Sequence, residues 1–160
     1  MGTSRARLDE IDWKILAALQ RDGRMTNIEL ARQVGLTAPP CLRRVRALEE
    51  AGLIRDYVAR LHGAALGYTI TVFALVSLKS QAEQDLRAFD EHVQAIPEVV
   101  ECLMLNGEID FILKIVAHDL QEFQSLLTSR LTTAPGVAHV KTSLTIRTSK
   151  DVGGIPITTA

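Results

Sequence analysis

The stretch TNIELARQVGLTAPPCLRRVRALEEAGL, residues 26–53, decides how the first part of the chain folds. Thr26 followed three residues later by Glu29 is a capping box, in which each side chain bonds the other residue's backbone at the start of a helix. Gly35 suits the end of that helix, because glycine adopts positive φ at no steric cost. The pattern predicts a short helix at 27–34 followed by a tight turn.

A second helix is predicted at 38–51, and its outer side is basic. Thr37 is placed to cap it, and Pro39 and Pro40 fit its first turn, where an amide hydrogen has no intrahelical partner. No acidic residue lies between Thr37 and Leu48. A helix, a glycine-containing turn and a basic helix form the arrangement that enters a DNA major groove. A purely structural helix pair is the alternative for this pattern taken alone. The candidate DNA-binding residues are Thr37, Pro39, Pro40, Arg43, Arg44 and Arg46.

Charge is divided unevenly along the chain. Residues 1–60 hold eleven Lys and Arg against eight Asp and Glu, a net charge of +3. Residues 61–160 hold seven against eleven, a net charge of −4, so the total of −1 hides the division. Because DNA affinity grows with the number of phosphate contacts, a module with so weak a positive charge is expected to act as a pair.

Several classes of protein and site are not indicated. No run of about 20 apolar residues predicts a membrane span, and the N-terminus lacks the apolar core of a signal peptide, so we expect a cytoplasmic protein without a membrane partner. Cys41 and Cys102 are interpreted as small buried residues rather than a disulfide. No Cys or His spacing matches a metal site, and neither a metal nor another cofactor is expected.

The second half of the chain alternates strands and helices. Strands are expected at 69–78, 98–105, 111–117 and 137–147, and helices at 82–96 and from Asp119 to the break at Pro135. The order βαββαβ is the ferredoxin-like arrangement, an antiparallel sheet with two helices on one face. Because the strand at 69–78 is apolar on both sides, the bare face is expected to pack against a second copy. Short strands are also expected at 53–61 and 152–157.

The fold class expected from these patterns is α+β. An N-terminal winged helix-turn-helix domain precedes a C-terminal ferredoxin-like βαββαβ domain. The expected limits are 1–54 for the first domain, 55–67 for a linker strand and joint, and 68–160 for the second domain.

Four segments carry a resemblance to a known family. They are LDEIDWKILAALQRDGR (8–24), NIELARQVGLTAPPCLRRVRALEEAGLI (27–54), ECLMLNGEIDFILKI (101–115) and PGVAHVKTSLTIR (135–147). In these segments the chain resembles the Lrp/AsnC family of transcription regulators. The resemblance spans nearly the whole chain, and Pro40-Cys41-Leu42 is its most specific local match.

The resemblance implies a transcriptional regulator of double-stranded DNA. It implies homodimers that bind pseudo-palindromic operators and commonly assemble to octamers, and an amino-acid-type effector held between C-terminal domains near the turn at 106–110. Gly107 and Asp110 match the family's Gly-Asp-x-Asp-Tyr pattern, whereas Glu108 and Phe111 depart from it. Taken alone, this turn is also an ordinary hairpin turn. The candidate effector-binding residues are Asn106, Gly107, Glu108, Asp110, Thr142, Ser143 and Thr145.

Two other functions are considered. A sirohaem-decarboxylase-like enzyme of the same fold would need positioned acid–base groups. The four histidines lie on different expected elements, and no catalytic motif is present, so we expect no catalytic residue and no enzyme activity: they are His62, His92, His118 and His139. An oligomerising module without an effector is the other alternative.

Overall fold

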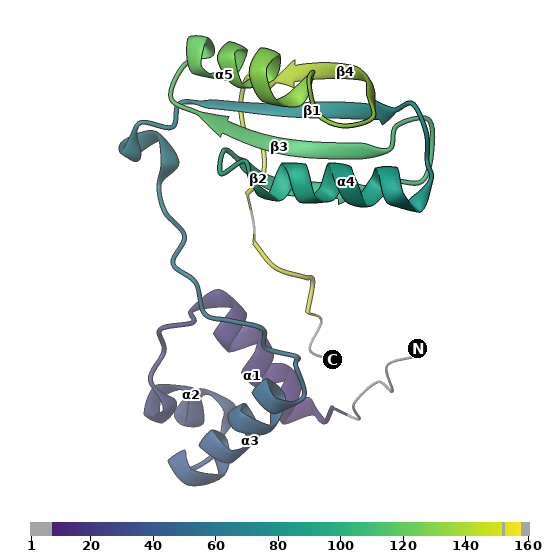
Figure 1. The fold of residues 1–160 in the computed structure, drawn as a ribbon. Coiled ribbons are helices and arrows are strands. Elements are labelled where there is room, and N and C mark those ends of the chain that lie inside the picture. The colour runs from purple at the N-terminus through teal and green to yellow at the C-terminus, as the bar shows by residue number, and fades with distance from the viewer. Residues whose placement is uncertain (1–7, 152, 158–160) are drawn as a thin grey trace. The chain divides into compact units, whose positions relative to one another are not determined.

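The structure, a computed structural model, describes residues 8–151 and 153–157. Contacts within the chain divide it into two compact units (Figure 1). The first unit comprises the described residues up to Arg60 together with Asp151 and 153–157, and the second spans Leu61–Lys150. Residues 153–157 are expected in the second domain from the sequence, whereas their contacts lie in the first unit.

Three helices build the first unit: α1 (Glu10–Arg21), α2 (Asn27–Val34) and α3 (Ala38–Glu50). Capping boxes start α1, with Asp9 and Asp12, and α2, with Thr26 and Glu29. Each box satisfies amide groups that the first turn of a helix leaves without partners. Apolar residues at helical spacing then meet in one core, made of Ile15, Ala18, Leu30, Ala31, Val34, Cys41 and Leu48.

The turn between α2 and α3 is closely held. Gly35 has φ 75°, and the N–H of Leu36 donates to the carbonyl of Ala31 at 2.8 Å. This bond is typical of a helix that ends on a left-handed glycine. The side-chain amide of Asn27 also donates to the carbonyl of Ala38 at 2.8 Å. The expected helix-turn-helix is therefore confirmed, with α3 ending at Glu50.

The strand expected at 53–61 is wrong. These residues have no strand neighbour within the described part of the chain. The N–H groups of Leu53 and Ile54 donate instead to the carbonyl of Leu48 at the end of α3, and the hydroxyl of Tyr57 donates to Glu49 at 2.9 Å. The segment is anchored to α3 by these bonds, which replace a ladder to another strand.

The second unit contains the expected βαββαβ order. The unit begins with a short 3-10 helix, η1 (Gly63–Leu66). Its further elements are β1 (Ile70–Leu78), α4 (Glu83–Gln94), β2 (Val99–Met104), β3 (Phe111–Ala117), α5 (Leu120–Leu126), the π-helical turn η2 (Leu127–Leu131) and β4 (Val137–Leu144). The strands are antiparallel in the order β2-β3-β1-β4. The ferredoxin-like fold is confirmed, and its strand limits lie within a few residues of those expected.

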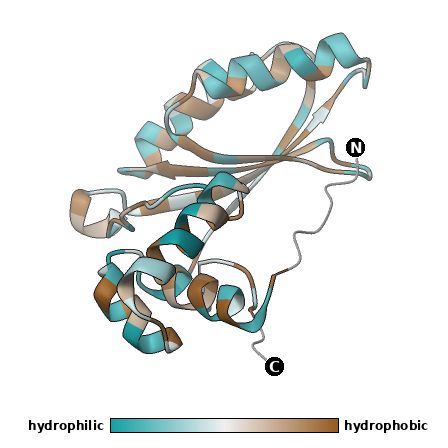
Figure 2. Cartoon of the chain, turned by 90° about the horizontal axis from the view of Figure 1, so that it is seen from below, coloured by the Kyte–Doolittle hydropathy of each residue, from teal (hydrophilic) through white to brown (hydrophobic). Residues whose placement is uncertain are grey.

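The two faces of this sheet differ. On one face, alternate residues of β1 and β3 are buried with Phe89 of α4 and Phe123 of α5. Figure 2 shows the helices of this unit on one side of the sheet. On the other face Phe73 and Leu103 are 36% and 49% exposed. We call this second surface the open face; it also carries Leu75, Ile112, Lys114, Val116, Lys141 and Ser143.

The edge strand expected at 152–157 is also wrong for its described residues. Residues 153–157 form no strand, and Val152 lies outside the described residues. The side-chain amide of Gln20 donates to the carbonyl of Ile155 at 2.7 Å and accepts from its N–H at 3.0 Å. The Gln20 side chain thus bonds the N–H and carbonyl of Ile155 that would otherwise pair with a neighbouring strand. No helix in the described ranges is long and apolar enough to cross a membrane.

Candidate DNA-binding surface and effector loop

The outer face of α3 is basic and exposed to solvent. Residues three or four positions apart share it and line a shallow depression: Pro39, Leu42, Arg43, Arg46, Ala47 and Glu50. Arg43 and Arg46 are exposed and form no salt bridge with any residue that the structure describes. Arginine offers five donors in a planar fork that suits phosphates and guanine edges. These two guanidinium groups are therefore available to a nucleic acid.

Arg44 is held differently from its two neighbours. Its Nη1 donates to Asp9 Oδ2 at 2.8 Å and to Asp12 Oδ1 at 2.7 Å. Both carboxylates belong to the capping box at the start of α1. Arg44 therefore ties α3 to α1 within the first unit, and its guanidinium is already engaged. The acidic partners that α3 lacks in its own sequence come from α1.

The same contacts shift two pKa values. The backbone N–H of Asp12 and the guanidinium of Arg44 bond the carboxylate of Asp9 and lower its pKa below the usual 3.8. Hydrogen bonds to Asp12 and Asp9 raise the pKa of Arg44 in turn. The charged forms of this cluster are thus stabilised together.

Thr37 occupies the N-cap position of α3 but makes no capping bond. A capping hydroxyl accepts from the N–H of the second or third helical residue. Those residues are Pro39 and Pro40, which have no N–H. The hydroxyl of Thr37 is consequently not used by the helix, and it lies at the positive end of the helix dipole, where anions are favoured.

The loop between β2 and β3 is closed at its base and open at its tip. The N–H of Leu105 donates to the carbonyl of Asp110 at 2.8 Å. Between them Asn106, Gly107 and Glu108 are exposed. No atom lies within 4 Å of the position where a side chain of Gly107 would begin. The tip is accessible to a small molecule.

Asp110 itself is turned inward and is only 6% exposed. Its Oδ2 accepts from the N–H of Leu78 at 2.6 Å, and its Oδ1 accepts from Nε2 of Gln81 at 2.7 Å. A buried carboxylate needs such donors to offset its lost hydration. Asp110 therefore fastens the loop to the segment that follows β1, with both oxygens engaged inside the protein.

The candidate residues of β4 do not share one face. Thr142 pairs with Ala74 on the face covered by helices, whereas Ser143 pairs with Phe73 on the open face. Thr145 follows the end of β4, and its hydroxyl oxygen is buried without a hydrogen-bond partner among the described residues.

The loop and these β4 residues lie toward opposite ends of the sheet. Phe111 follows the loop and pairs with Val76, whose partner on β4 is Val140. Ser143 is three residues beyond Val140, roughly 10 Å at the usual rise of a strand. Within one chain, the two halves of the candidate effector site are not brought together.

Histidines and cysteines do not gather into a site in the described residues. His92 bonds the carbonyl of Arg130 at 2.7 Å, and the ring of His118 stacks on Tyr68 with centroids 4.2 Å apart. Cys41 and Cys102 are free thiols, and burial raises the pKa of Cys102 to about 11. No group of three or more potential metal ligands occurs in the described residues.

The family follows from comparisons with known proteins. Residues 8–55 match the family model for winged helix-turn-helix DNA-binding domains, and residues 71–155 match the model for the Lrp/AsnC ligand-binding domain. The second match covers more than half of the chain. The chain belongs to the Lrp/AsnC family. The winged helix-turn-helix and ferredoxin-like parts of the expected fold are both confirmed.

Individual members of the Lrp/AsnC family agree with this assignment. The chain is 50% identical over 153 residues to the leucine-responsive regulatory protein of Rhizobium meliloti (strain 1021), covering 96% of this chain and 98% of that protein. A transcriptional regulator from Neisseria meningitidis, solved in complex with L-methionine, has a TM-score of 0.89 at 35% identity and covers 93% of this chain and 96% of its own. An AsnC family regulator from Agrobacterium tumefaciens has a TM-score of 0.87 at 31% identity, covering 93% and 97%.

This member of the family is a DNA-binding transcriptional regulator with a small-molecule ligand-binding domain. Sequence reasoning missed Asp9 and Asp12 as partners of Arg44, and Gln81 as a partner of Asp110. A local signal existed only for the first pair, because Asp9 and Asp12 have the spacing of a capping box. Asp9 lies 35 residues from Arg44 along the chain, and Gln81 lies 29 residues from Asp110. Local sequence patterns do not predict contacts over such separations.

Proposed function

We propose that Arg43 and Arg46 are the arginines of α3 that contact DNA. The observation that carries this proposal is the division among the three arginines: two are exposed and unpaired within the described residues, and Arg44 is bound to two carboxylates. Thr37, Pro39 and Pro40 would lie against the sugar–phosphate backbone of the DNA, with the Thr37 hydroxyl donating a hydrogen bond to a phosphate. Arg44 acts as a positioning residue for the helix.

DNA binding is proposed to require a dimer. Two exposed arginines make few phosphate contacts, and each contact adds to affinity. The exposed apolar side chains of the open face, Phe73 and Leu103 among them, support pairing through the sheet, since contiguous exposed apolar side chains commonly mark an interface. Two recognition helices related by a two-fold axis would bind pseudo-palindromic half-sites about one duplex turn apart, or a multiple of it. Further assembly to octamers is proposed on the family resemblance.

The effector is proposed to be a small amino acid bound at the tip of the β2–β3 loop. The open tip at Gly107 supports this, because exposed amides can bond a carboxylate, and Glu108 supplies a charge for an ammonium. Asp110 would position the loop. Since Ser143 lies on the open face, away from the loop, we propose that a second chain supplies it, whereas the buried hydroxyl of Thr145 is not offered to an effector. The related regulator with bound L-methionine supports this chemical class.

Enzyme activity is not part of the proposal. The relatives are transcriptional regulators, and no observation in the described residues favours the decarboxylase alternative. As a DNA-binding regulator, the protein is proposed to act in the cytoplasm.

Replacing Arg46 by alanine tests the DNA-binding proposal. If Arg46 reads a base, the variant loses about 1–3 kcal/mol of operator affinity and little affinity for random DNA. Fluorescence anisotropy with both duplexes measures the difference. Arg32→Ala, an exposed arginine of α2, is the matched control. An equal loss on both duplexes would assign Arg46 to phosphate, and no loss on either would overturn the proposal.

The effector proposal is tested by calorimetric titration of the full chain with the twenty amino acids. We expect heat from one or a few of them, and loss of the part of that heat that comes from the loop in Gly107→Val, which places a branched side chain at the loop tip. No heat from any amino acid would exclude this class of effector.

A further inference from the structure

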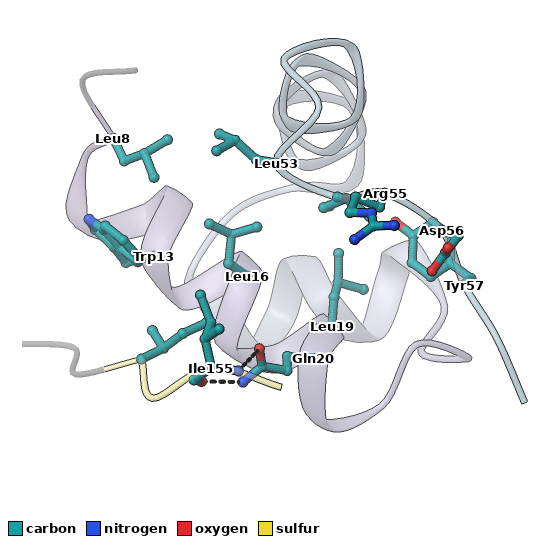
Figure 3. A pocket seen from close by; sticks show the side chains of 12 residues that line it. Leu8, Trp13, Leu16, Leu19, Gln20, Leu53, Arg55, Asp56, Tyr57 and Ile155 are labelled. Carbon is teal, nitrogen blue, oxygen red and sulfur yellow. Dashed lines mark hydrogen bonds between the residues drawn. The ribbon is translucent and has the colours of Figure 1, made fainter. Parts of the chain in front are cut away.

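A cavity lies in the first unit between α1, the segment that follows α3 and the C-terminal residues 155–157 (Figure 3). Its volume is about 270 Å³, and Leu8, Trp13 and Leu16 form much of its apolar wall. Leu53 and the segment that follows α3 line it from one side, and Ile155 and Ile157 line it from the other. The matched DNA-binding domain spans residues 8–55, so most of the residues that line this cavity belong to the DNA-binding part of the chain.

The C-terminal segment is held firmly enough to form a wall. Gln20 bonds both backbone groups of Ile155, and Arg60 forms a salt bridge with Asp151 at 2.6 Å. Gly154 has φ 100°, and a β-carbon there would lie 2.4 Å from the Gln20 side chain. A glycine is required at 154 for this close approach. The cavity is thus bounded by elements that specific contacts keep in place.

Opposite charges lie at one end of this apolar space. Arg55 and Asp56 are consecutive, exposed and among the residues that line the cavity. Neither forms a salt bridge within the described part of the chain. Figure 3 shows both side chains beside Tyr57 at the end of the cavity away from Trp13. A guanidinium and a carboxylate next to an apolar space complement a molecule with a carboxylate, an ammonium group and an apolar side chain.

We propose that this cavity is a second small-molecule site, which binds a free amino acid with an apolar side chain. Arg55 binds the α-carboxylate, Asp56 binds the α-ammonium group, and the side chain lies among Leu16, Leu53 and Trp13. The volume, just under the roughly 300–1,000 Å³ of sites for drug-sized ligands, suits a ligand of this size. The site is separate from the β2–β3 loop and does not depend on the effector proposal.

Trp13 makes the proposal directly testable, because it is the only tryptophan of the chain and lines the cavity. The full-length protein is titrated with L-leucine and L-methionine while tryptophan emission is recorded. We expect a saturable change in emission. N-acetyl-L-leucine amide, which keeps the side chain but lacks both charges, should bind at least about tenfold more weakly, since hydrogen bonds to charged groups contribute most. Absence of a saturable change with either amino acid overturns the proposal.

Variants separate this site from the loop. Arg55→Gln and Asp56→Asn should each weaken the emission response about tenfold or more, while Arg24→Gln, a change at an exposed arginine of the same unit, leaves it unchanged. Gly107→Val should keep the response even where it abolishes calorimetric heat from the loop. If Gly107→Val removes the emission change, or if Arg55→Gln leaves it intact, the signal comes from elsewhere and the second site is excluded. An emission change that follows protein concentration without any ligand would instead identify a second copy as the occupant, which also overturns the proposal.

Discussion

The two units of the chain differ in how much of their function one chain carries. In the first unit, the proposed DNA-binding surface is a single helix face, and contacts within that unit place Arg43 and Arg46 on it. In the second unit, the candidate effector residues are divided between a loop and the far end of β4. One chain therefore presents a complete recognition helix, whereas we propose that the effector site takes residues from a second chain.

The largest effect is expected from disrupting the open face of the sheet. Phe73→Asp places a charge at the centre of that face, and we expect a monomer, because a carboxylate buried without a partner is strongly unfavourable. Loss of the second recognition helix should lower operator affinity by about 10²-fold or more, the usual scale of bivalent binding. Sedimentation velocity and anisotropy measure the two effects.

Ser80→Asp, a change at an exposed position outside the strands, is the control for added charge. If Phe73→Asp stays dimeric with full operator affinity, the two copies do not pair through the open face, and the effector site must be sought within one chain.

A second test concerns the C-terminal segment. Gly154→Ala should destabilise the first unit by about 1–3 kcal/mol, because alanine at positive φ is strained and its β-carbon meets Gln20. Gly153→Ala is a matched neighbour: its β-carbon would meet Arg60 at 3.5 Å, an ordinary contact. Thermal melting of the full chain compares the two variants. Equal melting temperatures would show that the segment does not stabilise the unit.

A smaller effect is expected at Arg44. Replacing it by alanine removes two partly exposed ion pairs, and we expect a loss of about 1 kcal/mol in the free energy of unfolding. Arg43→Ala should leave stability unchanged and weaken DNA binding instead. Urea denaturation and anisotropy together test this division of roles. If Arg43→Ala destabilises as much as Arg44→Ala, the assignment of roles is wrong.

The smallest effect concerns acid stability. Hydrogen bonds lower the pKa values of Asp9 and Glu29, both in the first unit. Their stabilisation is complete above the ordinary pKa values of 3.8 and 4.5, and it is lost as pH falls through the lowered values. The melting temperature should therefore decrease when the pH is lowered below about 4, in part because Asp9 and Glu29 become protonated. Asp9→Asn should have a flatter pH profile in that range, and an unchanged profile would contradict the role of Asp9.

Local signals made the first unit the easier one to predict. Capping boxes and Gly35 act within four residues, and they marked the limits of α2 and the turn correctly. The prediction of a strand at 53–61 was wrong because alternating side chains do not show whether a second strand is available to pair with. Tyr57 bonds Glu49 of α3 instead. The partners of Arg44 and Ile155 lie 32 to 135 residues away along the chain. Only the folded arrangement brings such residues together.

For the second unit, the sequence supplied the order of strands and helices but not the role of each candidate. Aspartate is a common ligand contact, yet the carboxylate of Asp110 is buried and accepts hydrogen bonds from Leu78 and Gln81 inside the protein. Thr142 and Ser143 are neighbours in sequence and point to opposite faces. Residue type alone does not distinguish these cases, because the direction of each side chain depends on strand register.

The return of residues 153–157 to α1 has a practical consequence for protein engineering. A chimaera made by joining residues 1–60 to the sheet of another regulator would lack the apolar side chains of Ile155 and Ile157 and would leave Gln20 without its backbone partners. Domain exchange in this protein should therefore move residues 153–157 together with the three N-terminal helices.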